Sequence, residues 1–462
     1  MLALLLFLAD APKPVSYYRD VRKVFQQNCQ GCHQPARPMG GYVMTRHADL
    51  LKAGDSGKAG VVPGKAADSE LVRQSAPGKD GKAAMPKNKP PLAAADLALV
   101  RRWIDEGAKD DTPASAQDAV SDKNPPRYKL PPVISALDYS PDGALLAVAG
   151  FHEVLLHKGD GSGLVARLVG LSERVQSVAF SPDGKSLAVA GGAPGRFGEV
   201  QVWDVDKKRL RFSVSVTFDT LYGASWSPDG KMIAFGCADN SVRAIDAETG
   251  KQVLFNGVAG DWVLGTCFSQ DGKHLVSVSR DMAAKLTVVE TQRFVDNITS
   301  ITPGKLKGGI QAVALRPQAK PTKVKGVDGQ DKVYDEVVFG GSDGVPRLYK
   351  IHRVKQRTIG DDDNKVRDKY AAMPGRIFAL RFDKTGKRFA AGSSLDGKGE
   401  LRVYGTDDEK VQAKLETASV YAVAFHPDGK TVACAGSDGT VRLVDAATGK
   451  AAKEFVPVTL EK

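Results

Sequence analysis

The stretch Cys29-Gln30-Gly31-Cys32-His33 decides the fold of the N-terminal part of this chain. Two thiols lie three residues apart, and an imidazole follows the second directly. This C-x-x-C-H spacing is typical of covalent attachment of a c-type haem. Two cysteines on one helical turn can reach the two vinyl groups of a single haem as thioethers, and the histidine then ligates the iron. The motif therefore predicts one covalent haem c, held by Cys29, Cys32 and His33.

Two other kinds of site use a similar pair of cysteines. A thioredoxin-like redox pair needs a βαβ context, but a helical pattern precedes Cys29 and loop-like sequence follows His33. A zinc site needs a second pair of ligands at suitable spacing. The remaining cysteines, Cys237, Cys267 and Cys434, are far apart in the sequence, and we expect them to be buried apolar side chains. Haem attachment fits the sequence better than either alternative.

The residues on both sides of the motif predict a small all-α domain. Two amphipathic helices are expected, over residues 16–28 and 94–106, because apolar side chains recur there at helical spacing. Gly107 fits the glycine that ends a helix. The two apolar stripes consist of Tyr17, Val21, Val24 and Phe25 in the first helix and Leu97, Val100, Trp103 and Ile104 in the second.

Met85 is the candidate sixth ligand of the haem iron. It lies in a polar loop rich in glycine, lysine and proline, where Pro86 stiffens the segment that presents it. A thioether is one of the axial ligands that c-type haems use. Met39 and Met44 follow the motif too closely to cross easily to the other face of a haem, and His47 would give a bis-histidine iron. Alternatively, Met85 only fills a gap in the core.

Together these segments resemble the cytochrome c domain that is common in planctomycete proteins. The resemblance is carried by the C-x-x-C-H motif, by Ala84-Met85-Pro86 and by the run Leu-Val-Arg-Arg-Trp-Ile-Asp-Glu-Gly-Ala at 99–108. It covers residues 17–109 and implies that Cys29 and Cys32 are covalent anchors, His33 the proximal ligand and Met85 the distal ligand. It also implies export, because haem is attached to such domains outside the cytoplasm.

After Pro132 the chain repeats one unit, in which an apolar alternating run is followed by a turn and a second apolar run. The turns begin at Ser140, Ser181, Ser227, Ser269 and His426, with degenerate copies at Arg316 and Asp383. Most copies are 41 to 47 residues apart, and one interval of 67 contains an insertion around residues 318–335. Seven copies at this period predict a seven-bladed β-propeller with four strands per blade, although six or eight blades are alternatives.

The repeats are similar to WD40 repeats, although they contain a single Trp-Asp pair, Trp203-Asp204, and lack the Gly-His dipeptide. We therefore expect a multidomain protein, in which an all-α cytochrome c domain (12–109) is joined to an all-β WD40-like propeller (133–462). Residues 110–132, rich in Ala, Asp, Ser and Pro, are the predicted linker.

Residues 1–11 resemble a truncated or atypical signal peptide, because the short apolar run lacks a preceding basic residue and Pro12 follows its small-residue site. No other stretch is apolar enough to span a bilayer, so no transmembrane segment is expected. The predicted location is the periplasm or cell envelope.

The formal net charge of +11 is not accompanied by a recognised nucleic-acid module, so no nucleic-acid partner is expected. Around Met85 lie Lys79, Lys82, Lys87 and Lys89. A basic rim near a haem favours an acidic redox partner, although lysines also flank ordinary polar loops.

If the protein ligates the iron on both sides, the iron binds no substrate, which favours an electron carrier over an enzyme. By analogy alone, the propeller is a platform for a protein partner. Two alternatives stay open. The haem domain could pass electrons to a substrate or second cofactor in the propeller, or the haem could sense redox state or a gas.

Overall fold

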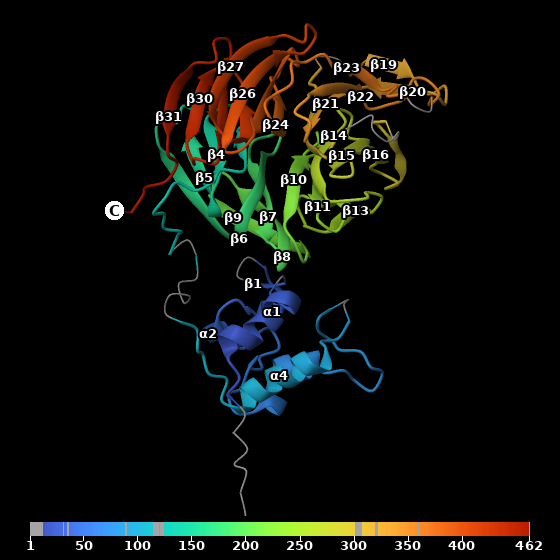
Figure 1. Cartoon of the computed structure of the whole chain (residues 1–462). Coiled ribbons are helices and arrows are strands. Elements are labelled where there is room, and N and C mark those ends of the chain that lie inside the picture. The colour runs from blue at the N-terminus through green and yellow to red at the C-terminus, as the bar shows by residue number, and fades with distance from the viewer. Residues whose placement is uncertain are drawn as a thin grey trace, which may run out of the picture. The chain divides into compact units, whose positions relative to one another are not determined.

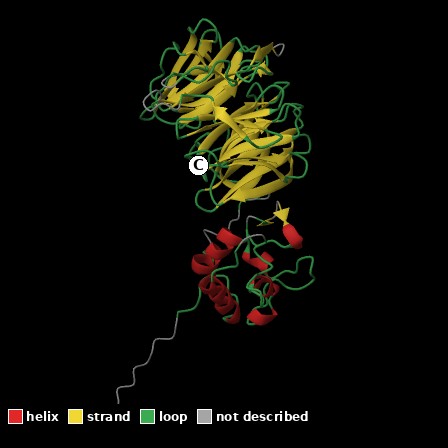
Figure 2. Cartoon of the chain, turned by 90° about the vertical axis from the view of Figure 1, so that its right-hand side faces the viewer, coloured by secondary structure: helices red, strands yellow, loops and turns green. Residues whose placement is uncertain are grey.

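The computed structural model divides the chain into two compact units, residues 1–119 and 120–462, and each unit is described by itself. The structure describes residues 13–30, 32–34, 37–87, 90–113, 120, 124–300, 307–318, 322–358 and 361–461. The predicted signal segment and Lys89 therefore lie outside the described residues. Helices occur in the first unit and strands dominate the second (Figure 2). Among the described helices, none has both the length and the apolar character needed to cross a membrane.

The first unit is a small α-helical domain, as the sequence predicted. Its helices are η1 (Tyr17–Val21), α1 (Arg22–Asn28), η2 (Met39–Gly41), α2 (His47–Leu50), η3 (Ala66–Asp68), α3 (Glu70–Ser75) and α4 (Ala94–Asp105), and its two short strands are β1 (His33–Gln34) and β2 (Arg37–Pro38). The predicted helix over 16–28 is a π-helical turn, η1, that continues into α1. Gly107, with φ of +101°, follows the end of α4 in a conformation that glycine adopts easily.

The first and last helices of this unit pack together through aromatic side chains. The ring of Tyr17 stacks on that of Trp103 at 5.3 Å, and Phe25 meets Trp103 edge-on at 6.3 Å. All three side chains are buried in one apolar cluster with Val100 and Ile104. Burial of these aromatic rings fixes η1–α1 against α4, and this packing positions the turn that follows α1.

In the second unit, the described strands form seven four-stranded blades. β6 (Leu164–Phe180) runs from the first blade into the second, which joins these two blades into one sheet. The first blade contains β3 (Leu137–Tyr139), β4 (Leu145–Ala149) and β5 (Phe151–Lys158), and the second contains β7 (Ser186–Ala193), β8 (Phe197–Asp204) and β9 (Arg209–Thr217). The third is β10 (Leu221–Trp226), β11 (Met232–Cys237), β12 (Val242–Asp246) and β13 (Gln252–Asn256). The fourth is β14 (Val263–Phe268), β15 (His274–Ser279), β16 (Ala284–Val288) and β17 (Phe294–Asn297).

The remaining three blades follow the same antiparallel order. The fifth is β18 (Ile310–Leu315), β21 (Glu336–Gly341), β22 (Arg347–Lys350) and β23 (Lys365–Arg367). The sixth is β24 (Arg376–Phe382), β25 (Arg388–Ser394), β26 (Lys398–Gly405) and β27 (Val411–Ala418). The seventh is β28 (Val420–Phe425), β29 (Thr431–Gly436), β30 (Val441–Asp445) and β31 (Ala451–Phe455). Within the predicted insertion, β19 (Thr322–Lys325) and β20 (Asp331–Tyr334) pair as a separate hairpin.

The ring closes where the seventh blade meets the first (Figure 1). The amide of Ile134 donates to the carbonyl of Gly436 at 3.0 Å. Tyr128 forms a parallel bridge with Leu460, next to the end of the chain. Tyr128 lies in the predicted linker 110–132, and so does Asp111, which accepts a hydrogen bond from the amide of Tyr18 in the helical unit. The two ends of the predicted linker thus contact the units that they adjoin.

Three of the repeat turns have the sequence Ser-Pro-Asp-Gly, at residues 140–143, 181–184 and 227–230, and this sequence forms a turn that side chains stabilise. In the second blade the hydroxyl of Ser181 donates to the Asp183 carboxylate at 2.6 Å, and the amide of Lys185 donates to the same oxygen at 3.1 Å. These two donors hold the pKa of Asp183 below its usual range. Gly184 completes the turn with φ of +73°, which explains why glycine follows the aspartate.

The innermost strand of each blade from the second to the seventh has a register shift near its start. In five of these blades the shift skips one residue of the innermost strand. A bulge of this kind re-aims the skipped side chain. The skipped residues are Gln176, Leu264, Gln311, Phe378 and Tyr421, and each lies five positions before the turn of its repeat.

Candidate cofactor site in the helical unit

The four predicted haem ligands and anchors line one cavity of about 420 Å³ in the helical unit. Cys29, Cys32 and His33 come from the turn after α1, and Met85 comes from the loop between α3 and α4. The cavity volume falls within the range of about 300–1,000 Å³ that is usual for cofactor sites. Residues more than fifty positions apart in the sequence therefore meet at one place.

The turn after α1 presents the two thiols and the imidazole from consecutive positions of a compact backbone. The amide of Cys29 donates to the carbonyl of Phe25 at 2.9 Å, at the C-terminal end of α1. The amides of Cys32 and His33 both donate to the carbonyl of Cys29 at 3.1 Å. Cys29 is half-buried and packs against the apolar core, and Cys32 is exposed. This arrangement suits attachment of a group that enters the cavity from outside.

His33 is oriented by the backbone of Tyr42. In the tautomer with a proton on Nδ1, the imidazole donates to the carbonyl of Tyr42 at 3.2 Å, and Nε2 is then the unprotonated nitrogen, the form that ligates a metal. The Tyr42 ring meets the imidazole edge-on at 5.9 Å, and its hydroxyl donates to the carbonyl of Leu50 at 2.7 Å. Burial, with the nearby Cys29, raises the pKa of Tyr42 well above its usual value. Tyr42 therefore stays neutral and holds His33 in place.

Met85 is held against α3 through its backbone. The amide of Met85 donates to the carbonyl of Gln74 at 2.8 Å. The Gln74 side chain in turn donates to Glu70 at 2.7 Å, one helical turn earlier. Leu71 and Leu92 are buried and also line this cavity, where they contribute apolar surface. The loop that carries Met85 is thus fixed at the cavity, although the Met85 side chain itself stays half-buried.

The structure also places the competing residues. Met39 and Met44 line the same cavity, the first 39% exposed and the second buried. His47 does not line it, because its Nε2 donates to the carbonyl of Ala108 at 2.7 Å and its ring packs against Tyr17. The geometry therefore offers three thioethers near His33, and it separates His47 from them.

Several residues that line the cavity lie outside the C-x-x-C-H motif and cannot be identified from it. Lys58 lines the cavity as Lys87 does, whereas Lys79 and Lys82 are exposed on the loop before Met85. Gly60 also lines the cavity, and a Cβ there would lie 2.0 Å from the Tyr42 hydroxyl oxygen. Glycine at this position is therefore required for the tyrosine that orients His33. A tyrosine and a glycine eighteen residues apart in loop-like sequence cannot be paired without the structure.

Elsewhere in the part of the chain that the structure describes, the titratable side chains form no comparable site. Among the described residues, no cluster of three or more histidine, cysteine or acidic side chains could hold a metal ion. Cys237, Cys267 and Cys434 are buried in the propeller, as the sequence predicted, and burial raises the pKa of each thiol to about 12.

Comparisons with known proteins agree with a helical unit followed by a propeller. The family model "Planctomycete cytochrome C" matches residues 29–89. "WD domain, G-beta repeat" matches 410–445, and "Anaphase-promoting complex subunit 4 WD40 domain" matches 196–258. Periodic tryptophan protein 2 of Saccharomyces cerevisiae is 24% identical over 296 residues. That similarity covers 56% of this chain and 29% of the yeast protein, so the chain spans less than a third of this relative's length.

The first match contains all four lining residues, Cys29, Cys32, His33 and Met85, and the other two fall on blades of the propeller. The chain therefore joins a planctomycete-type cytochrome c domain to a WD40-like β-propeller.

Proposed function

We propose that this protein is an electron carrier, in which the helical unit holds one covalent haem c and the propeller docks a partner protein. The observation that supports the haem most directly is the convergence of Cys29, Cys32, His33 and Met85 on one cavity. A haem bound there would exchange one electron at a time by cycling between Fe(III) and Fe(II).

The side chains that line the cavity are of the types that hold a haem c. Cys29 and Cys32 supply the two sulfur atoms for thioether bonds, and His33 has its Nδ1 satisfied by the Tyr42 carbonyl. Met85 supplies a soft thioether, a ligand type that favours the reduced metal. Met44, Leu71 and Leu92 are buried around the site and keep water from this part of the wall.

The side chains around the cavity also indicate the kind of redox partner. Lys58 and Lys87 line the cavity and are exposed, and Lys79 and Lys82 extend the positive charge along the loop. We propose that an acidic redox protein is steered to this rim, with faster association at low ionic strength. We further propose that the protein works outside the cytoplasm, in the periplasm or cell envelope, where covalent haem attachment takes place.

The proposal is tested by spectroscopy on the full chain produced in a host with haem-attachment machinery. We expect a low-spin spectrum, reversible oxidation and reduction, and no spectral change when carbon monoxide is added to the reduced protein, because both axial positions are filled by the protein. A high-spin spectrum, or a carbon monoxide complex of the unmodified protein, would instead support a sensor or an enzyme.

A further inference from the structure

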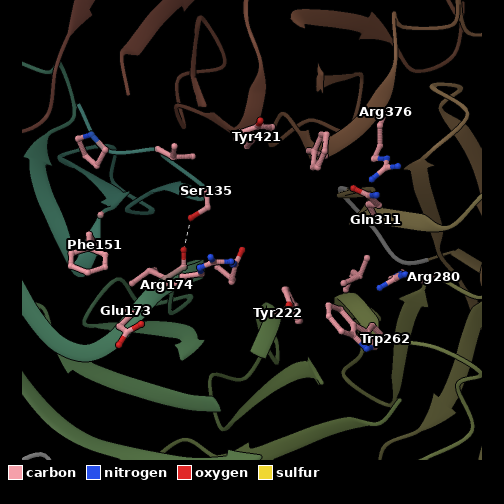
Figure 3. Close-up of a pocket in the computed structure, with 18 of the residues that line it drawn as sticks. Ser135, Phe151, Glu173, Arg174, Tyr222, Trp262, Arg280, Gln311, Arg376 and Tyr421 are labelled. Carbon is pink, nitrogen blue, oxygen red and sulfur yellow. Dashed lines mark hydrogen bonds between the residues drawn. The ribbon is translucent and has the colours of Figure 1, made fainter. Parts of the chain in front are cut away.

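A second and larger cavity, of about 1,200 Å³, lies in the propeller where the innermost strands begin (Figure 3). The five bulged residues, Gln176, Leu264, Gln311, Phe378 and Tyr421, all line it. Each is partly exposed, so the register shifts aim one side chain from each of five blades toward the same opening. The repeat therefore places one side chain from each of these five blades around the cavity, and the type of side chain differs from blade to blade.

Two of the arginines that line this cavity are not neutralised by any described carboxylate. Arg174 and Arg376 are exposed, and among the described residues no carboxylate lies within ion-pair distance of either guanidinium. Arg280 is paired with Asp261 at 3.6 Å, and Glu173 is paired with Arg196. The cavity thus keeps two uncompensated positive charges, each on a planar group that binds carboxylates through two parallel hydrogen bonds.

Aromatic rings lie between these arginines (Figure 3). Trp262 stacks on Tyr222 at 6.0 Å, and the Arg280 guanidinium lies 4.9 Å from the centre of the Trp262 ring. Phe378 meets Tyr421 edge-on at 5.0 Å. These rings are already packed against one another, so they offer apolar surface at little cost in conformational entropy.

We propose that this cavity binds an acidic peptide segment of a partner protein, one that carries an aromatic or large apolar side chain beside its carboxylates. The inference rests on the docking role proposed above and specifies its surface. Tryptophan, tyrosine and arginine are the residues that dominate binding energy in protein interfaces. Only two uncompensated arginines line the cavity, which matches a peptide with a few carboxylates better than a polyanionic nucleic acid or glycan. The volume exceeds that of most small-molecule sites, which favours a peptide.

The experiment begins with a random peptide library displayed on phage and selected on the immobilised full chain. The peptides enriched are expected to combine aspartate or glutamate with an aromatic or large apolar residue. Their affinity is then measured by titration calorimetry, and it is expected to fall as the salt concentration rises. Heparin, a polyanionic glycan, serves as the competing probe.

The variant Arg174→Ala/Arg376→Ala is expected to weaken binding of the selected peptide by about tenfold. Trp262→Ala is expected to weaken it through loss of the apolar contact. The matched control is Arg209→Ala/Arg293→Ala, which removes two exposed arginines that do not line the cavity and is expected to bind normally. Circular dichroism of each variant establishes that the fold is retained.

Three results would overturn the proposal: enrichment of basic or charge-independent peptides, full affinity in the Arg174→Ala/Arg376→Ala variant, or tight binding of heparin that displaces the peptide. None of these would alter the haem spectrum, so failure here is distinguishable from failure of the electron-transfer proposal.

Discussion

Met85→Ala is expected to lower the reduction potential of the bound haem by on the order of 100 mV and to open the sixth position of the iron. The thioether stabilises Fe(II) over Fe(III), so its loss favours the oxidised state. The amide of Met85 donates to the carbonyl of Gln74, and this backbone contact survives the substitution. Potentiometric titration gives the potential, and carbon monoxide binding by the reduced variant reports the open site.

The cavity offers a matched control for this experiment, because Met39 lines it as well. Met39→Ala removes a thioether of the same size from the same cavity and is expected to leave both the potential and the carbon monoxide response unchanged. If Met85→Ala has no effect while Met39→Ala opens the iron, the ligand has been assigned to the wrong methionine.

Glu153→Ala is expected to lower the free energy of unfolding of the propeller by about 3–5 kcal/mol, because it leaves a partly buried charge without its partner. Glu153 is 1% exposed and receives two hydrogen bonds from Arg167, at 2.6 and 2.7 Å. The hydroxyl of Tyr128 donates to the same carboxylate at 2.7 Å, and Arg167 also donates to the carbonyl of Pro126. Glu153 thus ties the segment before the first blade to the ring, next to the Tyr128–Leu460 bridge.

The measurement is urea unfolding of the full chain followed by tryptophan fluorescence, since three of the four tryptophans lie in the propeller. The control is Glu248→Ala, whose carboxylate is 81% exposed and pairs with Arg211 at the surface. That variant is expected to change the free energy of unfolding by less than about 1 kcal/mol. Equal effects of the two substitutions would show that Glu153 does not anchor the closure of the ring.

The sequence was sufficient for the features that depend on local patterns. The apolar stripe that includes Tyr17 and Phe25 predicted the first helix. The seven repeat turns, two of them degenerate, predicted seven blades in spite of the hairpin inserted into the fifth. The C-x-x-C-H motif and Met85 were predicted as haem anchors and ligands by residue type, and the structure places these residues around one cavity.

Features that depend on long-range contacts could not be predicted in the same way. Nothing in the local sequence indicates that Gly60 must be small to accommodate Tyr42, or that Glu153 receives hydrogen bonds from Tyr128. The bulged residues that line the propeller cavity could have been predicted from the sequence, because they lie at one fixed position before each turn. Alignment of the repeats on their turns would have brought Phe378 and Tyr421 into one column.

Covalent attachment of haem to Cys29 and Cys32 is tested by the intact mass of the purified full chain, made in a host with haem-attachment machinery and measured under denaturing conditions. We expect a mass increase of one haem in the unmodified protein and none in Cys29→Ser/Cys32→Ser. A protein of unmodified mass, with Cys29 and Cys32 recovered as thiols or as a disulfide, would contradict covalent attachment.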